Sequence, residues 1–142
     1  MQLQPYLFFD GRCEEAIKFY TSALGAKVEM LMRYKDSPDP KMRPPNASND
    51  NVMHACLRIG DTAVMASDGE CKGKAAFNGF SLSITAKDEK HAEKLFASLA
   101  EGGQVHMPLT KTFFASRFGT VADRFGVPWM VIAEPRQGAA KS

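Results

Sequence analysis

Two segments of the chain repeat one pattern: a short apolar stretch, a turn and an amphipathic helix. The first runs from Pro5 to Gly25, and the second runs from Phe80 to Gly103. A shift of 76 positions places the apolar helix residue Ala16 on Ala92, and it places Tyr20 on Phe96. A repeat of a whole supersecondary unit implies two modules of one design, so it constrains the fold more than any single motif.

The first segment predicts a strand, a turn and a helix. Residues 6–9 are aromatic or apolar and suit a buried strand, and Asp10 with Gly11 suits a turn. Asp10 is also a candidate N-cap, and Gly25 can adopt the left-handed conformation that ends a helix. One helix face is apolar, with Cys13, Ala16, Ile17, Tyr20 and Leu24 at helical spacing.

Three more strands are predicted in the first half. Residues 26–34 alternate as in a half-buried strand, and the proline-rich stretch 35–51 predicts a long loop. Residues 52–59 alternate most clearly, with His54, Cys56 and Arg58 on one face. The pair Gly60-Asp61 predicts a two-residue hairpin turn into a strand over 62–67.

The second half repeats this order. A strand over 80–86 should turn its hydroxyl residues Ser81, Ser83 and Thr85 away from the helix that follows. That helix carries an apolar stripe, and strands are expected over 104–114, 116–122 and 128–133, with a turn at 123–126. Its stripe consists of Ala92, Leu95, Phe96 and Leu99.

The predicted architecture is therefore α+β, with two βαβββ modules and helices on one face of each sheet. We expect a single domain over residues 1–142, made of module 1–68 and module 79–135 with a linker between them. With 44% hydrophobic and 24% charged residues, the composition is that of an ordinary globular protein.

Charge and composition exclude several classes of partner. The net charge is +2 and the basic residues are scattered, so we expect no nucleic-acid binding. No apolar run is long enough to cross a membrane and no signal segment is evident, so we expect no membrane association and a cytoplasmic location. The three cysteines do not form a disulfide framework.

Several motifs resemble one known family. Residues 5–9 (Pro-Tyr-Leu-Phe-Phe), 53–55 (Met-His-Ala), 59–61 (Ile-Gly-Asp) and the block 118–130 resemble the PhnB-like branch of the vicinal oxygen chelate (glyoxalase/bleomycin-resistance/dioxygenase) superfamily. The resemblance covers nearly the whole chain. It implies curved mixed sheets around a cleft, and a homodimer. We find no glycine-rich turn that could hold a nucleotide cofactor, so the methyltransferase label of some branch members is not expected here.

The resemblance also implies where a divalent metal would be held. The four ligand positions of the superfamily's metal enzymes fall on Pro5, His54, Ser81 (or Phe80 if the register slips by one) and Met130. Only His54 is a good ligand for Zn, Ni, Mn or Fe, and a thioether suits copper(I) instead. We therefore expect no metal ligands and no cofactor, with a divalent metal held by unconventional ligands as the alternative.

The candidate ligand-binding residues are His54, Cys56, Arg58, Ser81, Ser83, Phe113 and Met130. His54 is read either as a hydrogen-bonded structural histidine or as a general base in the cleft. Cys56 is read as a wall residue or a nucleophile, and Arg58 as an anion-binding group or a solvent-facing residue at the sheet edge. Trp129 is expected in the core.

Two function classes follow. The first is a metal-free protein that binds a small, partly apolar molecule in its cleft, as the superfamily's drug-sequestering members do. The second is a lyase, isomerase or dioxygenase-type enzyme of the same superfamily, with or without a metal. The residues at Pro5, Ser81 and Met130 favour the binding protein.

Overall fold

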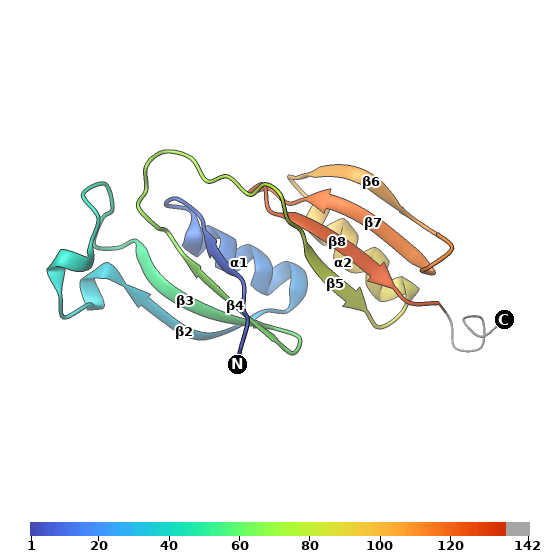
Figure 1. Ribbon diagram of the computed structural model, residues 1–142, viewed down its shortest axis with the longest axis horizontal. Coiled ribbons are helices and arrows are strands. Elements are labelled where there is room, and N and C mark those ends of the chain that lie inside the picture. Colours follow the sequence, from blue (N-terminus) through green and yellow to red (C-terminus); the bar gives the residue numbers. More distant parts are fainter. Residues whose placement is uncertain (136–142) are drawn as a thin grey trace. The chain divides into compact units, whose positions relative to one another are not determined.

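The chain forms two compact units, residues 1–75 and residues 76 onward, and each has its own four-stranded sheet (Figure 1). The computed structural model describes residues 1–135. Both units follow the order βαβββ, which confirms the predicted repeat and the α+β class. None of the helices in this described range is long and apolar enough to span a membrane.

The first unit contains β1 (Tyr6–Phe8), α1 (Cys13–Leu24), β2 (Lys27–Arg33), β3 (Val52–Ile59) and β4 (Thr62–Ser67). Its strand order is β1-β4-β3-β2, with β1 parallel to β4 and the other pairs antiparallel. The predicted two-residue turn joins β3 to β4, where Ile59 pairs with Thr62. The long loop after β2 holds two short 3-10 turns, Tyr34–Asp36 and Pro40–Met42.

The second unit repeats this topology with β5 (Leu82–Ala86), α2 (Glu89–Ala100), β6 (Gln104–Thr110), β7 (Arg117–Ala122) and β8 (Pro128–Ala133). Its strand order is β5-β8-β7-β6, with β5 parallel to β8 as β1 is to β4. The helices α1 and α2 have 12 residues each, so the shift of 76 positions that aligns their apolar residues also aligns both of their ends.

Each helix buries the apolar stripe that the sequence predicts. All four predicted residues of α2 are buried, and in α1 only Leu24 is partly exposed. The buried residues are Cys13, Ala16, Ile17 and Tyr20 in α1 and Ala92, Leu95, Phe96 and Leu99 in α2. Gly25 ends α1 with φ of 69°, as predicted.

The prediction that Asp10 caps α1 is wrong. Asp10 lies in the turn with φ of 52°, and the helix begins three residues later. The first N–H of the helix, that of Cys13, is instead accepted by the buried carboxylate of Asp68 at 2.7 Å. By contrast, α2 is capped locally, because Asp88 accepts the backbone N–H of His91.

Two strand predictions also need correction. The strand β2 lies at the sheet edge and none of its residues is buried, so the half-buried strand predicted there is wrong. Two register shifts in its pairing with β3 also break the predicted alternation. The strand β6 ends at Thr110 rather than at Phe114. The hydroxyl of Thr112 accepts the backbone N–H groups of Phe114 and Ala115, which turns the chain out of the sheet.

Trp129 lies in the core, as predicted, with 4% of its surface exposed. Its indole N–H donates to Asp123 Oδ2 at 2.9 Å. The other oxygen of Asp123 accepts the backbone N–H groups of Phe125 and Val127. Asp123 thus closes the predicted turn before β8 and satisfies the buried indole.

Candidate functional site

The sheet of the first unit has one face packed under α1 and one face open. On the packed face, Leu7, Ala55 and Ala66 are register partners and are all buried. On the other face, 37% of Tyr6, 55% of Phe8 and 41% of Met30 remain exposed. We call this second surface the open face; it consists of Tyr6, Phe8, Met30, Met32, His54, Cys56, Arg58 and Met65.

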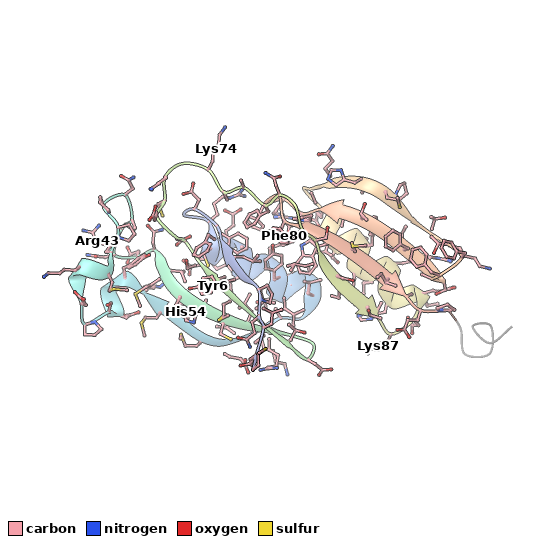
Figure 2. The ribbon with its side chains drawn as sticks, viewed as in Figure 1. Tyr6, Arg43, His54, Lys74, Phe80 and Lys87 are labelled. Carbon is pink, nitrogen blue, oxygen red and sulfur yellow. The ribbon has the colours of Figure 1, made fainter. Side chains whose placement is uncertain are left out.

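Tyr6 and His54, both labelled in Figure 2, form a hydrogen-bonded pair on the open face. The hydroxyl oxygen of Tyr6 lies 2.8 Å from Nδ1 of His54. The ring of Phe8 stacks on that of Tyr6, with centroids 5.0 Å apart. Burial raises the pKa of the Tyr6 hydroxyl, and a hydrogen bond with Ser67 partly offsets this effect. The hydroxyl therefore stays protonated at neutral pH.

Tyr6 was not among the candidate residues predicted from the sequence. The sequence predicts a buried strand there, because all of residues 6–9 are apolar or aromatic. Burial in fact alternates along this stretch, with Leu7 and Phe9 inside and Tyr6 and Phe8 on the open face. The register with β4 determines which of these side chains are buried, because it pairs Tyr6 with Met65 on the open face and Leu7 with the buried Ala66.

Cys56 and Arg58 share the open face with His54, as predicted. Arg58 Nε donates to Glu29 Oε2 at 3.1 Å, and a second guanidinium nitrogen donates to the carbonyl oxygen of Asp61. The hydrogen bond with Glu29 raises the pKa of Arg58. The sulfur of Cys56 lies 3.9 Å from the other oxygen of the same carboxylate. Arg58 is therefore already paired with an anion of its own sheet.

In the second unit, two of the four predicted residues pair within the sheet and the other two lie outside its strands. Ser83 and Met130 are register partners on the face away from α2, and Thr120 pairs with Met130 from the other side. Ser81 is exposed and precedes β5 instead of lying within it. Phe113 lies in the loop between β6 and β7 with 98% of its surface exposed, and its ring packs on Phe114.

Comparison with known proteins identifies the family of this chain. A family model described as 3-demethylubiquinone-9 3-methyltransferase matches residues 1–132. The chain belongs to this family. Protein YjdN of Escherichia coli (strain K12) is 36% identical over 140 residues, which cover 92% of this chain and 94% of YjdN.

Solved structures agree with this 3-demethylubiquinone-9 3-methyltransferase family. Protein PA1353 from Pseudomonas aeruginosa is 43% identical, with a TM-score of 0.83 over 94% of this chain and 98% of its own. The PhnB protein from Bacillus cereus is 27% identical, with a TM-score of 0.78 over 94% of this chain and 99% of its own. The PhnB-like resemblance is confirmed.

A more distant structure supports the fold alone. A glyoxylase/bleomycin resistance protein/dioxygenase domain from Frankia sp. EAN1pec has a TM-score of 0.63 at 13% identity, over 96% of this chain and 93% of its own. The glyoxalase/bleomycin-resistance fold predicted for this family member is therefore confirmed.

The four positions that correspond to metal ligands in the superfamily do not suit a divalent ion in this family member. Pro5 has no side-chain donor, and its carbonyl oxygen accepts the backbone N–H of Met65 at 3.0 Å. Ser81 is an exposed alcohol, and Met130 offers a soft thioether. No three of the described His, Cys, Asp and Glu side chains lie together as a metal site. The donor chemistry at these positions leaves His54 as the single suitable ligand.

Proposed function

We propose that the open face binds a small, partly apolar molecule without a divalent metal. The observation that carries the proposal is the hydrogen-bonded pair of Tyr6 and His54 within a partly exposed, mainly apolar sheet face. Aromatic and methionine side chains offer adaptable apolar contact area, and one polar group among them fixes the orientation of a ligand. The sheet would thus supply both contact area and one directional contact.

The polar contact is made by the ring nitrogen of His54 that faces away from Tyr6. Because the raised pKa of Tyr6 keeps its hydroxyl protonated, that hydroxyl can donate to Nδ1 and leave a proton on Nε2. In that arrangement, Nε2 donates to an acceptor oxygen of the ligand. Cys56 lines the same surface. Arg58, which is already paired with Glu29, lies at the edge of the proposed binding surface.

The predicted residues of the second unit are part of the proposal as well. The register partners Ser83 and Met130 offer a hydroxyl and an apolar group on the face away from α2. Phe113 is an accessible aromatic ring on the neighbouring loop, and Ser81 is an exposed hydroxyl before β5. We propose these four residues as candidate ligand contacts of the second unit, considered by itself.

A matched pair of variants on β2 tests the proposal. Val28 and Met30 are similarly exposed, at 47% and 41%, but Val28 pairs with buried Leu57 whereas Met30 pairs with Cys56 on the open face. We expect Met30→Ala to weaken binding of the amphiphilic fluorescent probe anilinonaphthalene sulfonate, and Val28→Ala to leave it unchanged. Equal effects of the two variants would contradict the assignment of the open face.

His54→Ala tests the polar contact. The side chain is partly exposed, so folding should be nearly unaffected, while binding of the same probe should weaken by about 1–3 kcal/mol because a polar partner is left unpaired. Metal stoichiometry of both proteins is measured alongside. Divalent metal that is present in the wild type and absent from the variant would favour the metal-dependent enzyme instead.

We further propose a homodimer. The edge strands β2 and β6 expose apolar side chains, with Val28 at 47%, Val105 at 44% and Met107 at 46%. Exposed edge strands with apolar side chains are surfaces that proteins cover by pairing or association. Sedimentation at micromolar concentration should give twice the mass of the chain, and a monomer there would remove this proposal.

A further inference from the structure

Sulfur ligands lie in one row across the open face. Register pairs Tyr6 with Met65, Met65 with Cys56, and Cys56 with Met30, so the row crosses all four strands of the sheet. Directly opposite residues in antiparallel strands point to the same face with Cβ atoms about 4.5–5.5 Å apart. Cys56 is therefore flanked in register by a methionine on each neighbouring strand, Met65 on β4 and Met30 on β2.

An imidazole lies in the adjacent row. His54 is two residues from Cys56 on β3, and its register partner on β2 is Met32. Nδ1 of His54 lies 2.8 Å from the Tyr6 hydroxyl oxygen. For metal binding, Nδ1–H donates to that oxygen and the lone pair of Nε2 is left for the ion, which is the other tautomer from the one that donates to the organic ligand. Ligating histidines are commonly oriented in this way, by a hydrogen bond at the ring nitrogen that does not bind the metal.

This donor set selects a soft ion. Thioether sulfur suits copper(I), whereas zinc, which also binds thiolate, is held in proteins by Cys, His, Asp and Glu side chains and not by methionine. Three of the 8 methionines lie on this one face, and two of them adjoin its cysteine in register. A purely apolar surface would be served equally well by leucine, so the placement of two methionines in register beside the one cysteine of this face points to a role for sulfur.

We propose that the open face binds one copper(I) ion through the Cys56 thiolate and the thioethers of Met30 and Met65, with Nε2 of His54 as a fourth ligand. On binding, the Cys56 S–H bond breaks as the Cu–S bond forms, the proton passes to the buffer, and the copper keeps its oxidation state. This site shares Met30, Cys56 and His54 with the surface proposed above for the organic ligand, so the two ligands compete for it. The copper site depends on sulfur, whereas the organic ligand needs only apolar area and one polar contact.

The test is an anaerobic titration of the reduced, metal-free protein with copper(I), in competition with the chelator bicinchoninate. We expect one copper(I) per chain and sulfur scattering in the X-ray absorption spectrum. Cys56→Ser and the double variant Met30→Leu/Met65→Leu should each lose the ion. Tyr6→Phe, which removes the partner that orients His54, should weaken copper affinity about 10–100-fold.

The control is Met107→Leu, a similarly exposed methionine on β6 of the other unit, which should bind copper(I) as the wild type does. Leucine keeps the volume and apolarity of methionine, so the double variant should retain its melting temperature. Failure of the wild type to take copper(I) from the chelator would overturn the proposal. Unchanged uptake by Cys56→Ser or by the double variant would overturn it as well.

Discussion

The carboxylate of Asp68 accepts the backbone N–H of Cys13 at 2.7 Å, across 55 residues of chain. Its other oxygen accepts the backbone N–H of Val52, also at 2.7 Å. Only 2% of Asp68 is exposed. One side chain after β4 therefore caps the start of α1 and holds the start of β3, so it ties together three elements of the first unit.

We predict that Asp68→Asn destabilises the protein by about 1–3 kcal/mol, because the amide keeps one acceptor and turns an NH₂ group toward a buried N–H. Denaturant unfolding followed by circular dichroism measures the change. Asp61→Asn, in the exposed hairpin turn, is the control and should leave the unfolding midpoint in place. Equal midpoints for wild type and Asp68→Asn would contradict the capping role.

Ile17→Asp should destabilise by at least roughly 3 kcal/mol, because it places a carboxylate on the buried face of α1. Ile17 is 6% exposed, whereas its neighbour Lys18 lies on the exposed face of the same helix. Lys18→Asp is therefore the matched control, with an expected loss well below that of Ile17→Asp. A similar melting temperature for the two variants would show that the face assignment is wrong.

Gly119 permits α2 and β6 to approach β7 closely. A Cβ atom at this position would lie 2.7 Å from Cε2 of Phe96 and 3.0 Å from the carbonyl oxygen of Met107. Gly119→Ala should therefore cost about 1–3 kcal/mol through overpacking. In calorimetry, Phe96→Leu in the same background should recover part of the loss, since it removes the closest atom. An unchanged melting temperature for Gly119→Ala would disprove the close approach.

Cys13 should resist alkylation until the protein unfolds. Its side chain is fully buried, and burial, followed by the negative charges of Asp68 and Glu14, raises the pKa of its thiol. Iodoacetamide labelling at neutral pH, read by peptide mass spectrometry, should modify the partly exposed Cys56 first. Labelling of Cys13 at the rate of Cys56 in the folded protein would contradict this prediction.

The raised pKa of Cys13 also has a consequence for stability. Because the folded-state pKa lies above the unfolded value, the protonated thiol stabilises the fold below the ordinary thiol pKa of about 8.5, and this contribution is lost as pH rises above it. The unfolding free energy should therefore fall on the alkaline side. Cys13→Ala should show a shallower fall than the wild type, and parallel curves would contradict the assignment.

The residue pattern within short segments of the chain was sufficient to predict the helices, the hairpin turn and the repeated βαβββ order. The helical stripes of α1 and α2, the hairpin at Gly60-Asp61 and the alternation along β3 depend on residues close together in sequence, and each is confirmed. The repeat of these patterns predicted two βαβββ modules, because each stripe needs a sheet to cover it. Side-chain periodicity is a local property, so the sequence alone carried it.

Tertiary structure decided which residues meet. The cap of α1 comes from Asp68 rather than nearby Asp10, and the partner of His54 is Tyr6, 48 residues away. The bulges in β2 place Met30 opposite Cys56, a pairing that strict alternation does not specify. Strand order and register are set by packing across the whole sheet. The sequence determined the elements, and the register between strands brought Tyr6, His54, Cys56 and the methionines onto one face.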